Sequence, residues 1–285
     1  MNDVSLVSAD SVPLEVVWRA FVDGFRGYVV PVELSFDEFE QVIADEKISL
    51  AASVVAVRDG VEPCGAAMLA IRTAESWCGG LGVVPSVRRT GLGRRMMLAI
   101  IKEARTRGVT RMRLECIDGN HAAWSLYEGI GFRPTRRLEI FRGAATPRPD
   151  AWKAASIWPL GDPGLVWNRF AAYHPVPPAW QTDLPVLRRH NPQRLLGWAI
   201  GDTERPRSYV LFRAFGDLVR IVDSGSSVPE QAADHLAMLV AALVESNPRC
   251  NLIAHNLPVE NSLNAVLRNA GVPVVLAQTE LELRF

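Results

Sequence analysis

Residues Leu81–Arg95 read LGVVPSVRRTGLGRR, and the rest of the chain is best interpreted outward from this stretch. Its apolar start is typical of a buried strand, which Pro85 ends. Gly91–Arg107 follows as a helix, because its apolar residues recur at helical spacing and Gly108 ends it. The first turn of a helix offers unpaired N–H groups and a partial positive charge, which together attract anions. The sequence therefore predicts an anion site here, flanked by four arginines: Arg88, Arg89, Arg94 and Arg95.

Two common nucleotide-binding loops do not fit this stretch. A P-loop needs G-x-x-x-x-G-K-[ST], which is absent. A dinucleotide fingerprint needs a third glycine where Met96 stands. The alternative without function is a glycine-rich helix start surrounded by solvated arginines.

Upstream and downstream of this stretch, helices and strands alternate. Ser35 and Glu38 have the spacing of a capping box at the start of a helix. Asp59-Gly60 is a turn signal after a β-branched run. We expect an α/β (α+β) sheet protein with these elements: strands at Val4–Ser8, Leu50–Arg58, Gly65–Arg72, Trp77–Val84, Arg111–Cys116 and Phe132–Phe141, and helices at Pro13–Gly24, Ser35–Asp45, Gly91–Arg107 and Asn120–Glu128.

A shift of 140 residues aligns the second half of the chain with the first. The helix at Gly91 then meets Ala232–Glu245, and the strand at Arg111 meets Asn251–Asn256. This pattern predicts an internal duplication with domains at 1–146 and 147–285. The glycines and arginines of the first copy are replaced in the second by Val228–Ala233, so we expect no anion site there.

Composition and charge exclude several classes of protein. Lys+Arg and Asp+Glu both number 31, so the formal net charge is zero, which argues against a nucleic-acid binder. The chain has no run of about 18 apolar residues, so we expect no membrane span. The N-terminus lacks the pattern of a secretory signal. The four cysteines form no C-x-x-C pair, and we expect buried, reduced thiols and no metal site in a cytoplasmic protein.

The motif V-x-P-x-x-R-x-x-G-x-G at Val83–Gly93 resembles the acyl-CoA signature of the Gcn5-related N-acetyltransferases, the GNAT superfamily. Downstream, Ala123–Phe132 resembles the family's A-x-x-L-Y-x-x-x-G-F ending. The resemblance implies two GNAT-like domains, each with a mixed, mainly antiparallel, twisted sheet flanked by helices. The first domain would be active, and the second would be degenerate.

The resemblance implies acetyl-CoA as co-substrate, without a metal. The strand Leu81, Gly82 and Val83 would pair with the pantetheine arm, and the Val83 N–H would stabilise the oxyanion. Asn120 would bind the pantetheine from the other side. The pyrophosphate would lie against the residues of the loop and the first turn: Arg88, Arg89, Thr90, Gly91, Leu92, Gly93 and Arg94.

The same resemblance implies the proton-transfer groups. Tyr127 would protonate the departing thiolate, a task that suits a phenol with a pKa of about 10; the alternative is a ring packed under the sheet. Glu115 would take the proton of the acceptor ammonium, directly or through water, or would simply pair with an arginine. His121 is a further candidate base, although its place at a helix start favours a solvated residue.

The acceptor is poorly marked. The segment Asp23–Tyr28 lies between two expected helices. Its Phe25 and Tyr28 would line a subsite for the acceptor, and Glu33 further along would bind an ammonium group. The alternative is that the segment is simply a packed loop. We expect an N-acetyltransferase that acts on a primary amine, of a small molecule or a peptide, by direct attack in a ternary complex. The alternative is a non-catalytic acyl-CoA sensor or partner-binding module. The chain would be a monomer or a homodimer.

Overall fold

The computed structural model describes residues 4–146, 152–153, 155–189 and 195–285, and these form two units. Unit 1 comprises Met1–Thr135 together with Thr279–Phe285, and unit 2 comprises Arg136–Gln278. These bounds differ from the sequence-based domains, because the last seven residues of the chain belong to the first unit. Residues 147–151, where the sequence places the boundary, lie outside the described residues.

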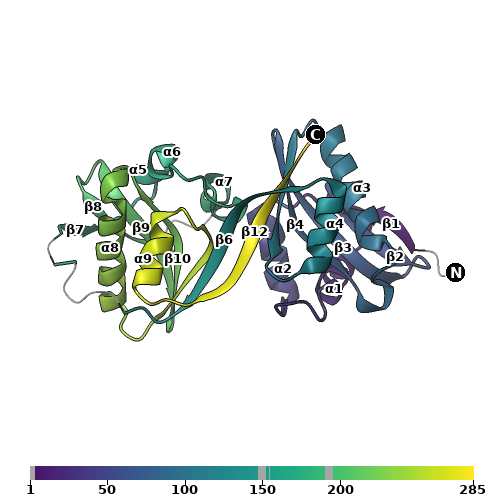
Figure 1. The fold of residues 1–285 in the computed structure, drawn as a ribbon, viewed down its shortest axis with the longest axis horizontal. Helices are drawn as coiled ribbons and strands as arrows, with labels where there is room; N and C mark the ends of the chain where they lie inside the picture. Colours follow the sequence, from purple (N-terminus) through teal and green to yellow (C-terminus); the bar gives the residue numbers. More distant parts are fainter. Residues whose placement is uncertain (1–3, 147–151, 154, 190–194) are drawn as a thin grey trace. The chain divides into compact units, whose positions relative to one another are not determined.

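Unit 1 is built on a mixed sheet that carries helices on both faces (Figure 1). Within it the strands follow the order β1-β2-β3-β4-β5, with only the pair β4–β5 parallel. Its elements are β1 (Val4–Ser8), α1 (Leu14–Gly24), α2 (Phe36–Glu46), β2 (Val54–Arg58), β3 (Glu62–Arg72), β4 (Glu75–Val83), α3 (Leu92–Thr106), β5 (Arg111–Ile117), α4 (His121–Ile130) and the start of β6 (Arg133–Gly143).

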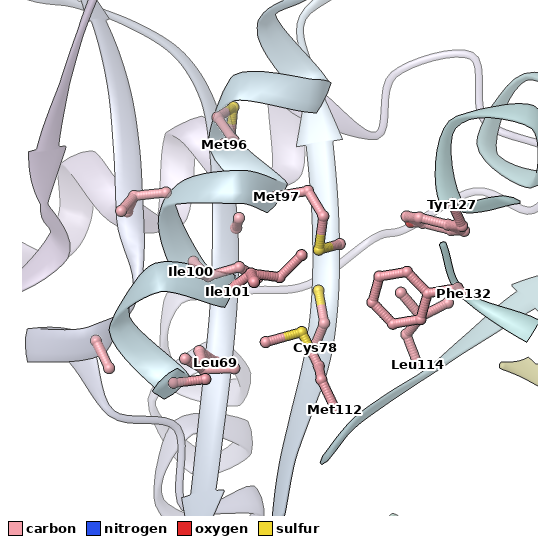
Figure 2. Close-up of a cluster of buried hydrophobic side chains, with 14 of the residues drawn as sticks. Leu69, Cys78, Met96, Met97, Ile100, Ile101, Met112, Leu114, Tyr127 and Phe132 are labelled. Atoms are coloured by element: carbon pink, nitrogen blue, oxygen red, sulfur yellow. The ribbon is translucent and has the colours of Figure 1, made fainter. Parts of the chain in front are cut away.

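Both faces of this sheet are buried, which explains the continuous apolar run along β2. Val54 and Ala56 pack in the core under α3, whereas Val55 and Val57 pack in the core under α1 and α2. Successive side chains of a strand point to opposite faces, so a strand covered on both sides must be apolar throughout. Figure 2 shows the first of these cores, in which side chains of α3 meet those of the strands and of α4.

The predicted helix starts and strands of unit 1 are confirmed, with small changes at their ends. Ser35 and Glu38 form the capping box of α2, and the Asn120 side chain caps α4 by accepting a hydrogen bond from Ala123 N–H at 3.1 Å. The prediction of one strand over Leu50–Arg58 is wrong at its start. Leu50–Ala52 is a 3-10 turn, and the hydroxyl of Ser53 binds the carbonyl of Ser49 at 2.7 Å as the strand begins.

The strands β4 and β5 pair only at one end. Their parallel register runs from Glu75 opposite Arg111 to Trp77 opposite Arg113 and then stops. Just beyond, the ladder between β4 and β3 carries a bulge at Gly79, since Leu69 pairs with Cys78 and Met68 with Gly80. A bulge bends a strand and increases its twist, so it turns β4 away from β5. The far ends of the two strands therefore leave a gap in the sheet.

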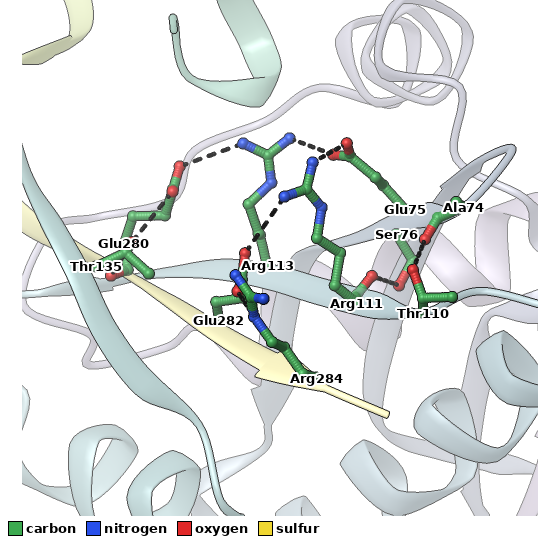
Figure 3. Close-up of polar contacts among 10 residues, drawn as sticks. All are labelled: Ala74, Glu75, Ser76, Thr110, Arg111, Arg113, Thr135, Glu280, Glu282 and Arg284. Atoms are coloured by element: carbon green, nitrogen blue, oxygen red, sulfur yellow. Dashed lines mark hydrogen bonds and ion pairs between the residues drawn. The ribbon is translucent and has the colours of Figure 1, made fainter. Parts of the chain in front are cut away.

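The C-terminal strand β12 (Val274–Arg284) runs into unit 1, where its last residues join an ion-pair network (Figure 3). Arg113 pairs with Glu75 at 2.6 Å and with Glu280 at 3.8 Å, and Arg111 pairs with Glu75 and with Glu282. Burial by itself would raise the pKa of Glu75, but the hydrogen bonds and charges of the two arginines outweigh burial and lower it. The network fastens the chain's end beside β5.

Unit 2 repeats the plan of unit 1. Its strands follow the order β6-β11-β10-β9-β8-β7, again with one parallel pair, β10–β11. Its longer elements are β8 (Leu196–Gly201), β9 (Pro206–Phe215), β10 (Leu218–Ser226), α8 (Ala232–Ser246), β11 (Asn251–Pro258) and α9 (Ser262–Asn269). Between β6 and β8 lie the short elements β7 (Ile157–Pro159), α5 (Gly164–Trp167), α6 (Phe170–Tyr173) and α7 (Leu184–Leu187).

The predicted duplication agrees with these bounds. Adding 140 to the bounds of α3 reproduces those of α8, and β5 starts 140 residues before β11. The pair β10–β11 also ends after three residues, as β4–β5 does. In unit 2, however, the chain itself packs closely on the bent strand, because a Cβ on Gly225 would lie 2.7 Å from the Cβ of Tyr173.

All four cysteines are buried free thiols, as expected. In the part of the chain that the structure describes, no helix combines the length and the apolar character needed to cross a bilayer.

Candidate functional site

A cleft of about 400 Å³ opens in unit 1 where β4 and β5 separate. This volume lies within the range of about 300–1,000 Å³ that is usual for small-molecule sites. Three elements converge on it: the end of β4, the N-terminus of α3 and the start of α4. Its lining includes most of the predicted site residues: Phe25, Tyr28, Leu81, Gly82, Val83, Arg88, Arg89, Gly91, Leu92, Gly93, Arg94, Asn120 and Tyr127.

One end of the cleft is built to receive an anion. Gly91 is the N-cap of α3 with φ of 82°, and the first helical bond runs from Arg95 N–H to Gly91 C=O at 3.1 Å. The N–H groups of Leu92, Gly93 and Arg94 therefore have no acceptor within the helix, and Gly91 offers no side chain to cap them. A Cβ on Gly91 would meet nothing within 4 Å, so the backbone here is open to a ligand.

Four of the residues predicted to bind the cofactor here have polar side chains, and these side chains differ in what they contact. Arg89 and Arg94 line the cleft, and Arg94 reaches the carbonyl of Gly129 at 3.2 Å. Arg88 also lines the cleft, but its guanidinium donates to the carbonyls of Val83, Gly24 and Arg26 at 2.8, 3.2 and 2.5 Å. Thr90 does not line the cleft, and its hydroxyl donates to the carbonyl of Val87. We interpret Arg88 and Thr90 as residues that shape the loop.

The edge of β4 offers one backbone donor to the gap. Val84 N–H donates to the carbonyl of Cys64 on β3 at 2.9 Å. Because N–H groups alternate in direction along a strand, the Val83 N–H faces away from β3, toward the side where β5 is missing. Gly24 and Gly82 bring α1 close to this edge, since a Cβ on Gly24 would lie 2.7 Å from the Gly82 carbonyl carbon.

Two phenols and an amide lie across the gap. Burial raises the pKa of Tyr28, and the side chain of Asn120 offsets part of this rise. Tyr127 is 7% exposed, lines the cleft and packs against Phe132 with ring centroids 5.9 Å apart (Figure 2). Burial raises the pKa of Tyr127 well above 10, and the nearby Glu115 charge adds a smaller contribution. Tyr127 is therefore a protonated phenol that reaches the cleft.

Glu115 sits on the part of β5 that β4 no longer pairs with. Its carboxylate accepts a hydrogen bond from the indole Nε1 of Trp77 at 2.7 Å. Glu115 is not among the residues that line the cleft, which favours contact with an acceptor through water. Neither sequence motif includes Trp77, and the signal that could have pointed to it is a tryptophan just before Cys78-Gly79-Gly80.

The comparisons with known proteins agree with this geometry. The model of the acetyltransferase (GNAT) family matches residues 16–132, which lie in unit 1 and include the whole cleft. Residues 16–132 therefore match a GNAT domain. The GNAT match does not extend into unit 2, whose resemblance to unit 1 is one of fold.

Three known proteins are similar to this chain. Over 71 residues it is 44% identical to the [ribosomal protein bS18]-alanine N-acetyltransferase of Salmonella typhimurium, covering 25% of this chain and spanning about half, 48%, of that relative. A GCN5-related N-acetyltransferase from Sphaerobacter thermophilus has a TM-score of 0.69 at 17% identity, with 99% and 95% of the chains covered. A tandem GNAT protein from the clavulanic acid biosynthesis pathway has a TM-score of 0.63 at 13% identity, with 99% and 98% covered. The two structures confirm the fold of two GNAT-like domains.

Only some of the predicted acceptor residues lie at the cleft of unit 1. Phe25 and Tyr28 line the cleft and pack edge to face, with ring centroids 5.0 Å apart. Phe25 also lies over Gly82 and Gly80 of β4. Glu33 is exposed and does not line the cleft, so its role stays a prediction. His121 is likewise exposed at the start of α4.

The thiols near the cleft are poor nucleophiles. Burial raises the pKa of Cys78 to about 12 and that of Cys116 to about 11. Only a thiolate attacks a thioester efficiently, so neither cysteine is activated at neutral pH.

Proposed function

We propose that unit 1 is an acetyl-CoA-dependent N-acetyltransferase that acts on a primary amine by direct attack in a ternary complex. The observation that carries this proposal is the convergence of the α3 N-terminus, Asn120 and Tyr127 on one cleft at the gap between β4 and β5.

Acetyl-CoA fits the groups that line this cleft, and it supplies the activated acetyl group. Arg89, Arg94 and the backbone N–H groups of the first turn of α3 would hold its pyrophosphate. The exposed edge Leu81–Val83 would pair with its pantetheine arm, and Asn120 would bind that arm from the opposite side. The Val83 N–H would stabilise the negative charge that develops on the thioester oxygen when the amine attacks the carbonyl carbon.

Two residues move protons. The acceptor arrives as an ammonium ion, and Glu115 takes a proton from its nitrogen through water, so that the nitrogen lone pair can form the new C–N bond. As the C–S bond breaks, the phenol of Tyr127 gives its proton to the departing sulfur and regains one from the acylated nitrogen through solvent. The balance is one amide, one CoA thiol and one proton released.

Direct attack is favoured over a covalent acyl-enzyme. A covalent route would need an activated nucleophile beside the cleft. Cys78 and Cys116 are buried and carry raised pKa values, so both stay protonated and unreactive.

The test is release of CoA thiol when the full chain is given acetyl-CoA and a panel of amines. The panel should contain amino acids, polyamines, aminoglycosides and peptides, including peptides that begin with alanine because of the Salmonella relative. Amine-dependent thiol release supports the proposal. Tight acetyl-CoA binding with no release from any amine would favour the second candidate, an acyl-CoA sensor, which the degenerate unit 2 motivates.

A further inference from the structure

We propose that Trp77 is the positioning residue for the base Glu115, and that Gly79 makes room for it. This inference rests on the proposed function, because it assigns the part that Trp77 plays in the same reaction. The contact that carries it is the hydrogen bond from Trp77 Nε1 to Glu115 Oε2 at 2.7 Å.

The contact lies at the point where the sheet opens. Trp77 is the last residue of β4 that pairs with β5, opposite Arg113. Glu115 comes two residues after Arg113 and therefore projects from the same face, but from the part of β5 beyond its pairing with β4. The indole thus spans from the closed end of the strand pair to the open end.

The indole can hold this position because it is buried and packs over Gly79. Trp77 is 5% exposed. A Cβ on Gly79 would lie 2.6 Å from Trp77 Cζ3 and 3.0 Å from Trp77 Cη2, so the ring covers the site where any other residue would place its side chain. Gly79 is also the bulge residue of β4. The same glycine therefore turns β4 away from β5 and gives the indole its place.

A glutamate side chain has several rotamers, and a base works only when it is held in reach of its proton. The short bond from a neutral indole fixes one oxygen of Glu115 and so restricts the rotamers of its carboxylate. A displacement of about 1 Å in a catalytic group lowers rates by up to about 100-fold. Loss of the indole N–H should therefore lower turnover without changing acetyl-CoA binding.

The contact is tested first without any acceptor. In the full chain labelled with ¹⁵N at its tryptophans, each of the eight indoles gives one N–H signal. The Trp77 signal is identified by its loss in Trp77→Phe. We expect the Trp77 signal to change its chemical shift in Glu115→Gln, because the charged acceptor is replaced by a neutral amide, while the signals of the other indoles stay nearly unchanged. A Trp77 signal that is the same in the wild type and in Glu115→Gln would overturn the proposal.

Kinetics with the best amine of the panel then test the consequence. We expect Trp77→Phe to lower kcat about 10-fold with the KM for acetyl-CoA unchanged, and Gly79→Ala to do the same by displacing the ring. The matched control is Trp158→Phe in unit 2, which loses an indole bond to the Gly201 carbonyl and should keep wild-type kcat. Wild-type kcat in Trp77→Phe would overturn the proposal. A Trp77 signal that changes in Glu115→Gln, together with a wild type that acetylates no amine, would support the contact and contradict the proposed function.

Discussion

The Nε of Arg88 donates a hydrogen bond to the carbonyl of Val83 at 2.8 Å, while its Nη2 reaches the carbonyls of Gly24 and Arg26. One guanidinium therefore ties the end of β4 to the loop after α1. Val83 carries the proposed oxyanion donor, and the loop after α1 carries Phe25 and Tyr28. The Arg88 side chain therefore connects the two sides of the cleft, and all three of its acceptors are backbone carbonyls.

Arg88→Ala should consequently destabilise unit 1. Hydrogen bonds to charged groups contribute about 1.5–3 kcal/mol when buried, and Arg88 is exposed, so we expect a loss of about 1–2 kcal/mol in the free energy of unfolding. Urea unfolding of the full chain measures this. Arg95→Ala is the matched control, because Arg95 is also exposed but binds one backbone carbonyl, that of Val4. Equal stability of the two variants would contradict the role of Arg88.

Tyr127→Phe should lower kcat about 100-fold or more and leave folding nearly unchanged, because only the hydroxyl is lost. Its raised pKa also predicts the pH dependence. Burial keeps the phenol protonated beyond its ordinary value of about 10, so the rate should not fall from loss of this proton below pH 10. Steady-state rates from pH 6 to 10 check both points. A wild-type rate in Tyr127→Phe would remove Tyr127 as the acid.

In unit 2, a buried His174 should make stability depend on pH. His174 Nε2 contacts Asp223 at 3.0 Å, and Nδ1 contacts the carbonyl of Phe170 at 2.9 Å, so both nitrogens face acceptors. Burial lowers the pKa of His174, but the hydrogen bond and charge of Asp223 outweigh burial and raise it above 6.5.

A raised pKa means that the charged histidine stabilises the folded state. This contribution is complete below the unfolded pKa of about 6.5 and is lost as pH rises through the folded pKa. The difference in melting temperature between wild type and His174→Gln should therefore be larger at pH 5.5 than at pH 9. A difference that is constant with pH, or that grows as pH rises, would contradict the charged pair.

The sequence predicts the cleft well because its signals are local. Gly91 and Tyr127 stand in the two short motifs that resemble the GNAT signatures, the same resemblance points to Asn120 at a helix start, and all three line the cleft. Arg88 contacts carbonyls that lie 62 and 64 positions away in the sequence, and Trp77 contacts a carboxylate 38 positions away. No local sequence pattern predicts such distant contacts. The return of Thr279–Phe285 to unit 1 is of the same kind, since the sequence of a strand does not specify which strand lies beside it.

A comparison of Gly91 with Gly60 distinguishes the effect of backbone strain from the effect of ligand binding. Its φ of 82° and that of Gly60, 74°, both favour glycine, and a Cβ at either position would meet nothing within 4 Å. Gly91→Ala and Gly60→Ala should each cost about 1–2 kcal/mol of stability. Only the change at Gly91 should also weaken acetyl-CoA binding, because Gly60 lies in the turn between β2 and β3, outside the residues that line the cleft.

Calorimetric titration of the full chain with acetyl-CoA tests the central claim most directly. Wild type and Gly60→Ala should bind one acetyl-CoA per chain, and Gly91→Glu, which sets a negative charge at the helix N-terminus, should bind at least about 10-fold more weakly. Absence of binding heat in the wild type across temperatures, or equal affinity in Gly91→Glu, would contradict the assignment of this cleft to acetyl-CoA.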